Sequence, residues 1–150
     1  MYGFFRVGAA VPELKVADCG FNTKEILNVI EQAKKKNIRA LVFPELCISS
    51  YTCGDLFLQK TLIDACEKSV FDIAKHTSDT DMYIILGLPV EMDCRTFNCA
   101  AVLYKGKILA LIPKTYIPNY GEFYEKRWFA SANEAVSKEI IFCGQTVPVG

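Results

Sequence analysis

Apolar residues in the first half of the chain follow first a strand pattern, then a helix pattern, then a strand pattern again. Residues 4–11 form an apolar run rich in β-branched and aromatic side chains, which predicts a buried first strand. From Asn22 or Thr23, either of which suits an N-cap, apolar residues recur at helical spacing and lysines follow them at the end. Residues 38–43 are a second apolar run, so the pattern predicts a strand, helix, strand unit over residues 4–43.

The second half predicts one more helix and three more strands. Residues 59–75 have one apolar side and one charged side, as an amphipathic helix does. Residues 82–90 are a continuous apolar run that predicts a strand. Residues 96–104 and 107–112 read as a hairpin, because the glycine between them can adopt the positive φ that a tight turn needs.

The end of the chain has a different pattern. An aromatic and charged loop runs from Pro113 to Phe129. Residues 140–143 and 146–150 look like a strand and the start of another, with no partner after them. An unpaired edge strand is an aggregation liability, so this ending suggests a chain cut inside a larger domain. Taken together, the elements predict an α/β or α+β fold with a sheet covered by helices.

Composition and charge narrow the class of protein. The chain has 150 residues, 51% of them hydrophobic, and 17 basic against 17 acidic side chains. One domain of this length buries about 70% of its unfolded surface, which excludes intrinsic disorder. Balanced charge without a basic stripe argues against nucleic-acid binding. The apolar runs are far shorter than the roughly 20 residues that cross a bilayer, and the N-terminus has no leader, so we expect a cytoplasmic protein that binds no membrane.

Cysteine and histidine are poorly spaced for a metal site. The single histidine is His76, no Cys-x-x-Cys pair occurs, and the number of cysteines is odd. We therefore expect no metal and predict that most thiols behave as small buried hydrophobes in a reducing compartment. The cysteines are at positions 19, 47, 53, 66, 94, 99 and 143.

Two segments share the order apolar strand, proline, charged residue. Glu45 follows Pro44 and Lys114 follows Pro113, with opposite charges. A charge just past the end of a core strand lies where sheet proteins commonly form clefts. Leu46 follows Glu45, so we expect apolar surroundings for the carboxylate, which suit a general base. The same pattern also suits a structural ion pair that caps two neighbouring strands, and spacing alone leaves both readings open.

The loop over residues 116–128 is dense in aromatic and charged side chains. Such a loop can form the wall of a small-molecule pocket, because tyrosines supply both packing surface and hydroxyl groups. It can equally cover a hydrophobic core or contact another subunit. Composition does not separate these roles.

Several ordered motifs resemble one known family. Residues 43–46, Lys114 and residues 121–129 resemble the glutamate, lysine and post-lysine motifs of the nitrilase, or carbon-nitrogen hydrolase, superfamily. Residues 51–57 and 118–125 resemble one branch, the N-terminal glutaminase domain of glutamine-dependent NAD synthetases. The resemblance spans nearly the whole chain. One departure is Ser50, where related sequences often have glycine before the tyrosine.

This resemblance implies a nitrilase-like α-β-β-α sandwich that hydrolyses the side-chain amide of L-glutamine through a Glu-Lys-Cys triad. Glu45 matches the general base, and Lys114 matches the lysine that stabilises the oxyanion. Tyr51, Tyr120 and Glu125 match glutamine-binding positions, and Glu125 is also suited to hold Lys114. The intact enzyme would pass ammonia to deamido-NAD in a synthetase domain that uses ATP and magnesium, and the family forms homo-oligomers.

The third triad member has no match in the chain. In the family the catalytic cysteine lies well after the lysine loop, and no such segment occurs before Gly150. Residues 1–150 therefore read as a partial carbon-nitrogen hydrolase domain, incomplete at the C-terminus, without the synthetase domain and without its own nucleophile. We expect this chain alone to be inactive. The alternatives are part of another nitrilase-like amidase acting on a small amide, or a non-catalytic assembly module.

Overall fold

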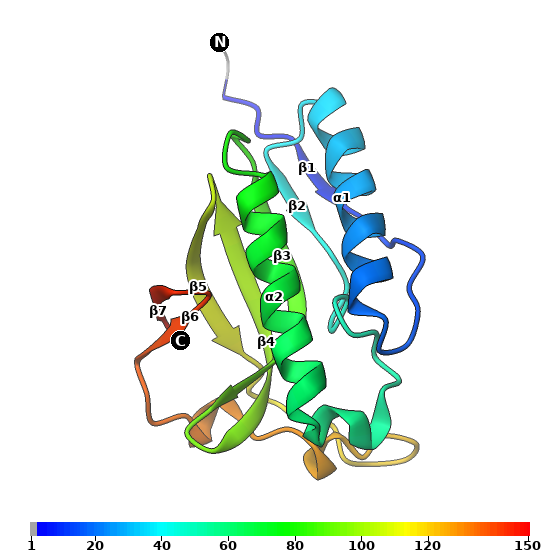
Figure 1. The fold of residues 1–150 in the computed structure, drawn as a ribbon, viewed down its shortest axis with the longest axis vertical. Coiled ribbons are helices and arrows are strands. Elements are labelled where there is room, and N and C mark those ends of the chain that lie inside the picture. Colours follow the sequence, from blue (N-terminus) through cyan, green and yellow to red (C-terminus); the bar gives the residue numbers. More distant parts are fainter. Residues whose placement is uncertain (1–2) are drawn as a thin grey trace.

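A five-stranded sheet with two helices on one face forms the body of the protein. The computed structural model describes residues 3–150, so Met1 and Tyr2, which belong to the predicted leaderless N-terminus, lie outside the described residues. Figure 1 shows α1 and α2 side by side across the sheet. In chain order the elements, with 3-10 helices marked η, are β1 (Val7–Ala9), α1 (Cys19–Lys35), β2 (Ala40–Val42), η1 (Gly54–Leu58), α2 (Lys60–His76), β3 (Tyr83–Met92), β4 (Arg95–Tyr104), β5 (Lys107–Pro113), η2 (Glu125–Arg127), η3 (Ala132–Glu134), β6 (Glu139–Phe142) and β7 (Gln145–Pro148).

The strand order is β1-β2-β3-β4-β5, and the directions are mixed. β1, β2 and β3 are parallel, whereas β4 is antiparallel to both β3 and β5. It follows that β2, β3 and β5 run in the same direction and that their carboxyl ends lie at the same edge of the sheet. The predicted mixture of helices and strands is confirmed. No helix within residues 3–150 is both long and apolar enough to cross a membrane.

The main hydrophobic core lies between the sheet and the two helices. Alternate residues of β3 and β4 point toward the helices and are almost completely buried, as the two-residue period of a strand requires. They pack in one cluster with the apolar sides of α1 and α2, whose spacing matches the predicted helical pattern. Core members include Ile26, Ile30, Val70, Ile73, Leu86, Leu88, Phe97 and Ala101.

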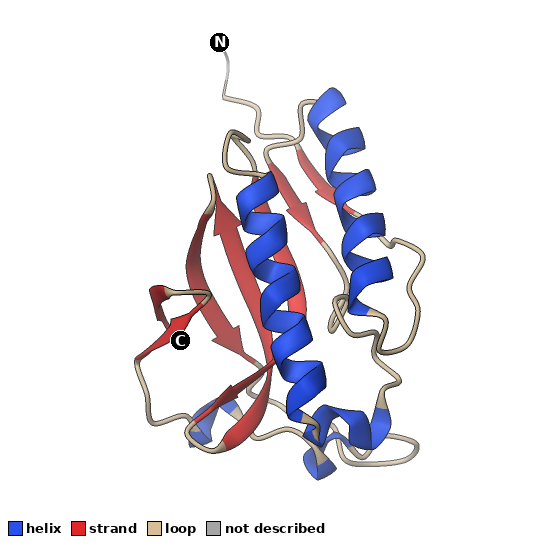
Figure 2. Ribbon diagram, viewed as in Figure 1, coloured by secondary structure: helices blue, strands red, loops and turns tan. Residues whose placement is uncertain are grey.

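The prediction of a buried strand over residues 4–11 is wrong in both length and burial. β1 has only three residues, and Phe4 is 96% exposed and Val7 67% exposed. The reason is the position of β1 at the edge of the sheet, where it pairs with β2 alone. Val7 also shares its face of the sheet with Val42, and both α-helices cover the other face (Figure 2).

The predicted start of the first helix is also wrong. The N-cap of α1 is Asp18, four to five residues earlier than expected, and its side chain accepts a hydrogen bond of 2.9 Å from Phe21 N. Asn22 and Thr23 lie inside the helix. Asn22 is fully buried and donates its side-chain amide to the carbonyl of Ile48 at 2.9 Å. This contact with a distant segment outweighs the local capping preference of asparagine.

The remaining elements follow the predictions more closely. The helix expected over residues 59–75 is α2, with Gln59 as its N-cap. The predicted hairpin is β4–β5, and its turn residues Lys105 and Gly106 both have positive φ. A register shift between Val102 and Leu103 marks a β-bulge in this hairpin.

The last two strands do have partners, contrary to the prediction for residues 140–150. β6 and β7 pair with each other in antiparallel fashion through a turn at Cys143 and Gly144. Cys143 N donates to the Glu67 side chain of α2 at 2.7 Å, and Gly150 N donates to Leu111 O of β5 at 3.1 Å. The hairpin is therefore attached both to α2 and to the β5 edge of the sheet.

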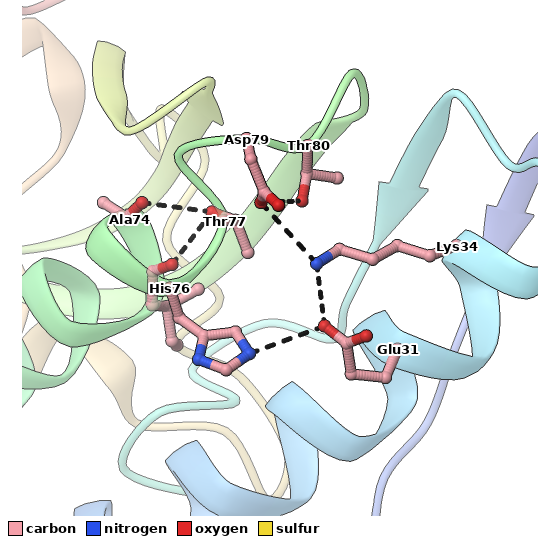
Figure 3. Close-up of polar contacts among 8 residues, drawn as sticks. Glu31, Lys34, Ala74, His76, Thr77, Asp79 and Thr80 are labelled. Carbon is pink, nitrogen blue, oxygen red and sulfur yellow. Dashed lines mark hydrogen bonds and ion pairs between the residues drawn. The ribbon is translucent and has the colours of Figure 1, made fainter.

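Polar side chains join the C-terminal ends of the two helices. Lys34 Nζ lies 2.8 Å from Glu31 Oε1 and 4.0 Å from Asp79 Oδ1, and His76 Nε2 lies 3.4 Å from the same Glu31 oxygen (Figure 3). These groups are largely exposed, and such pairs are each worth about 0–1 kcal/mol. These pairs connect the two helix ends but add little to the stability that the hydrophobic core provides.

Candidate active site

Glu45 and Lys114 come together at the edge of the sheet where β2 and β5 end. Lys114 directly follows β5, and Glu45 lies three residues after β2. Their side chains form an ion pair, with 2.7 Å between Lys114 Nζ and Glu45 Oε1. β3 and β4 lie between the two strands, so the pair does not cap neighbouring strands as one reading of the sequence expected.

The turn that carries Glu45 rests directly on the backbone of β3. Ile48 N donates to Gly87 O at 3.2 Å, and Leu46 has a φ of +53°. A Cβ atom at Gly87 would lie 2.3 Å from Leu46 N and 2.7 Å from Pro44 O. Only glycine permits so close an approach. The turn thereby brings the Glu45 carboxylate over the sheet to β4.

Asn98 of β4 is a member of the site that the sequence analysis missed. It is 4% exposed, and its side-chain amide donates a hydrogen bond to Glu45 Oε1. Its main-chain carbonyl accepts a hydrogen bond of 2.8 Å from Lys114 N. Asn98 thus contacts both members of the ion pair. The signal that could have indicated it is a lone amide between Phe97 and Cys99 in a strand that is otherwise largely apolar.

Glu125 is the second carboxylate around Lys114. It is 2% exposed, and its two oxygens accept different donors. The Tyr51 hydroxyl donates to Oε1 at 2.6 Å, and Lys114 Nζ lies 2.9 Å from Oε2. The backbone of η2 fixes this position, because Phe129 N donates to Glu125 O at 2.9 Å. A buried carboxylate with two donors has its charge compensated.

The result is a continuous hydrogen-bonded chain from Tyr51 through Glu125, Lys114 and Glu45 to Asn98. Burial of the Lys114 ammonium acts to lower its pKa, but the adjacent carboxylates of Glu45 and Glu125 outweigh burial, and the pKa is raised. The Lys114 side chain is therefore charged at neutral pH. For Tyr51, desolvation and then the hydrogen bond to Glu125 raise the pKa, so its hydroxyl keeps the proton and acts as donor.

The surroundings of Glu45 differ from the apolar pocket that the sequence predicted. Its side chain is 41% exposed and is paired with Lys114 and Asn98. Leu46 points into the core instead, where it is fully buried. The positive φ of Leu46 sends the two adjacent side chains to different environments.

A second contact ties together the two segments that carry Tyr51 and Glu125. Asp55 of η1 accepts two hydrogen bonds from the Arg127 guanidinium, at 2.6 and 2.8 Å, and one from Trp128 Nε1 at 2.9 Å. The hydrogen bonds from Arg127, and then from Trp128, hold the pKa of Asp55 well below its usual range. The carboxylate therefore stays charged and keeps η1 aligned with η2.

Tyr120 lies apart from this hydrogen-bonded chain. It is 73% exposed, and its ring packs edge-on against Phe123 with 5.9 Å between centroids. Tyr120 and Lys114 both line a cavity of about 1170 Å³, whereas Glu45 and Tyr51 do not. This cavity lies between the β3–β4 turn, residues 57–63 at the junction of η1 and α2, and residues 114–134. The structure thus brings together four of the five predicted site residues.

The two thiols that follow Glu45 most closely in the sequence, and the thiol of Cys143, are poorly suited to nucleophilic chemistry. Cys47 and Cys53 are buried, and Cys47 Sγ donates to Gly87 O at 3.6 Å. Burial raises the pKa of Cys47 to about 12, and burial also raises the pKa of Cys143 to about 12. A thiol that stays protonated at neutral pH is a weak nucleophile. Residues 3–150 contain no group of three or more His, Cys, Asp or Glu side chains arranged to hold a metal ion.

Comparison with known proteins agrees with the motifs. The chain is 33% identical over 132 residues to the glutamine-dependent NAD(+) synthetase of Mycobacterium leprae, covering 88% of this chain and 19% of that protein. It is 36% identical over 126 residues to the enzyme of the same name from Aquifex aeolicus, covering 83% and 22%. The chain therefore spans about a fifth of the length of these relatives.

Solved structures show the same fold. A glutamine-dependent NAD(+) synthetase from Cytophaga hutchinsonii matches 97% of this chain and 25% of its own length, with a TM-score of 0.89 and 34% identity. An amidase from Nesterenkonia sp. matches 95% of this chain and 53% of its own, with a TM-score of 0.70 and 20% identity, which indicates the fold alone. The carbon-nitrogen hydrolase family profile matches residues 6–148, and the chain belongs to this family.

Proposed function

We propose that this chain is the N-terminal part of the glutamine-hydrolysing domain of a glutamine-dependent NAD synthetase. The observation that carries the proposal is the chain of contacts in which Lys114 lies between Glu45, at 2.7 Å, and Glu125, at 2.9 Å. Such an arrangement offers a carboxylate to accept a proton and a permanent positive charge to stabilise an oxyanion. The similarity to proteins named glutamine-dependent NAD(+) synthetase supports this substrate over other amides.

The proposed chemistry uses Glu45 and Lys114 in sequence. Glu45 takes the proton of a cysteine thiol, which we place beyond Gly150, and the sulfur electron pair attacks the side-chain amide carbon of glutamine. The Lys114 ammonium stabilises the negative oxygen that forms. Glu45 then gives its proton to the leaving ammonia. Water attacks the thioester with Glu45 again as base, which releases glutamate and restores the thiol.

Substrate binding is assigned to Tyr51, Tyr120 and Glu125. The negative charge of Glu125 can pair with the α-ammonium of L-glutamine as it does with Lys114. The hydroxyl of Tyr51 is 2.6 Å from Glu125 Oε1. The side chain of Tyr120 is exposed and lies outside the hydrogen-bonded chain. We propose it as part of the wall that faces entering substrate.

The other parts of the proposal concern the intact enzyme. The ammonia would pass to a synthetase domain of the same polypeptide, where ATP and magnesium activate deamido-NAD. No step on this chain is assigned to either cofactor. Cytoplasmic location and homo-oligomer formation remain predictions of the same proposal.

The deciding experiment is Lys114→Ala in the intact enzyme, which contains both the glutamine-hydrolysing domain and the synthetase domain. Loss of one oxyanion stabiliser is worth about 3 to 4 kcal/mol, so glutamine-dependent NAD formation is expected to fall by about 10² to 10³-fold. Formation of NAD from free ammonia bypasses the glutaminase site and is expected to stay unchanged, which makes it the internal control. Near-normal turnover with glutamine would exclude this role for Lys114.

The 150-residue chain alone is expected to release no glutamate from L-glutamine, because we place the nucleophilic cysteine of the proposed reaction beyond Gly150. The measurement is glutamate production by the purified chain over hours. Steady release that disappears in Glu45→Gln would show that a nucleophile is present within the chain. Release of ammonia from other small amides by the intact enzyme, with glutamine unused, would favour the alternative of a different amidase.

A further inference from the structure

We infer that Asn98 is a positioning residue for Glu45 and that it selects Glu45 Oε2 as the oxygen that accepts the proton. The inference rests on the proposed function, since it names how the base of that reaction is held. The inference follows from which oxygen of the Glu45 carboxylate already accepts hydrogen bonds. Three contacts define the arrangement.

Both donors that reach Glu45 bind the same oxygen. The Asn98 side-chain amide donates to Oε1, and Lys114 Nζ lies 2.7 Å from that same Oε1. No hydrogen bond reaches Oε2 from any residue of the described part of the chain. The Glu45 side chain is 41% exposed, so its carboxylate is partly open to solvent.

This asymmetry makes the two oxygens chemically different. An oxygen that accepts a hydrogen bond from an amide and another from an ammonium has much of its negative charge compensated. The other oxygen keeps its lone pairs free and is the better proton acceptor. In the proposed reaction the S–H bond breaks, the new O–H bond forms at Oε2, and the electron pair stays on sulfur.

Asn98 is the donor that prevents the carboxylate from turning. Lys114 is a point charge on a flexible stem, and without a second donor the carboxylate could rotate to place both oxygens against it. The amide of Asn98 comes instead from a central strand, from a side chain that is 4% exposed. Its carbonyl also holds Lys114 N at 2.8 Å, so a single residue sets the distance between base and ammonium.

The first test is independent of catalysis. In the 150-residue chain, the side-chain amide signal of Asn98 is measured by NMR in wild type, Glu45→Gln and Glu122→Gln. The charge-assisted bond predicts that the Asn98 amide protons shift strongly in Glu45→Gln and stay in place in Glu122→Gln, because Glu122 is exposed. An unchanged Asn98 signal in Glu45→Gln would overturn the inference whatever the protein's activity.

The second test uses glutamine hydrolysis by the intact enzyme. Asn98→Leu keeps most of the side-chain volume and removes the donor, and is expected to lower kcat about 10- to 100-fold with little change in KM. Asn98→Asp places a second carboxylate beside Glu45, and two adjacent negative charges repel each other. The acid limb of the pH profile of glutamine hydrolysis is therefore expected to move upward by about one unit or more. Asn133→Asp adds the same charge at an exposed site and is expected to leave the profile unchanged.

These outcomes separate the inference from the function on which it rests. A wild-type enzyme that does not hydrolyse glutamine overturns the proposed function. A wild-type enzyme that does, with an unchanged kcat in Asn98→Leu and an unchanged pH profile in Asn98→Asp, overturns the positioning role alone. If Asn98 had a purely structural role, its substitutions would lower the urea midpoint of the enzyme and leave the acid limb of the pH profile unchanged. That result would also count against the inference.

Discussion

Gly87 lies beneath the turn that holds Glu45, and a single methyl group there would collide with backbone. The added Cβ would be 2.3 Å from Leu46 N. Because the neighbouring atoms belong to main chain, the conflict cannot be relieved by rotating a side chain. We expect Gly87→Ala to lower the free energy of unfolding by about 1–3 kcal/mol, the usual cost of overpacking. Urea denaturation of the purified chain measures this change.

The matched control for this prediction is Gly20→Ala. Gly20 lies in the first turn of α1, and a Cβ there would meet only Asp18 Oδ1 at 3.7 Å. Alanine favours the helix, so this variant is expected to be stabilised by about 0.5–1 kcal/mol. Equal effects of the two substitutions would mean that the contact between Gly87 and the turn is not a close one.

At the level of single residues, the sequence alone identified part of the candidate site. Glu45 and Lys114 could be found because charges after a strand and a proline are conspicuous. Asn98 was missed. Its lone amide in an apolar strand is visible in the sequence, but nothing in a linear pattern shows which residue of β4 lies beside a turn that follows β2. The exposure of the Glu45 carboxylate was also missed, because it depends on the positive φ of Leu46 and not on the hydrophobicity of its neighbours.

At the scale of elements, the β3–β4 turn is pinned to the segment before β6 by Asp93. Its carboxylate accepts hydrogen bonds from Ser137 Oγ at 2.6 Å, Ser137 N at 3.0 Å and Val136 N at 2.8 Å. The side-chain bond from Ser137, followed by the two backbone bonds, holds the pKa of Asp93 below its usual value. The contact therefore stabilises the fold above the unfolded pKa of aspartate, about 3.9, and is lost as the pH falls through the lower folded value.

Asp93→Asn is expected to lower the urea midpoint at pH 7, where the wild-type carboxylate is charged. The difference from wild type should narrow as the pH falls below about 4, because the wild-type group then becomes protonated and loses its advantage. Urea midpoints of both proteins between pH 7 and pH 2.5 test this. A difference that stays constant over the range would show that charge plays no part.

Elements with strong local patterns were predicted, and those defined by long-range contacts were not. α2 and the β4–β5 hairpin carry their own signals in helical spacing and in the glycine turn at Gly106. β1 reads as a core strand because its residues are apolar, yet burial depends on its neighbours, and β1 is at the sheet edge. The β6–β7 pairing was missed because Cys143 was read as the last residue of one strand and residues 146–150 as the unpaired start of another, although Cys143 belongs to the turn that joins the two.

For the molecule as a whole, stability should be uneven between the two sheets. β3 and β4 are central and have a strand on either side, whereas β6 and β7 pair with each other and connect to β5 through a bridge between Leu111 and Val149 and a side-chain hydrogen bond from Ile108 N to Gln145. Two-stranded hairpins are marginal by themselves. We expect the amides of Ile140 and Phe142 to exchange faster with deuterium than those of Leu88 and Ala101. Hydrogen exchange followed by NMR tests this, and equal protection would show that the hairpin unfolds only with the main sheet.

The ion pair between Glu45 and Lys114 has a consequence for a chain emerging from the ribosome. The two residues are 69 positions apart and belong to segments that follow β2 and β5, with β3 and β4 between them. A nascent chain that has released only the first strands holds a carboxylate without its ammonium partner. This edge of the sheet is therefore assembled only after β5 has been synthesised and docked, so the ion pair forms late, once the central strands are in place.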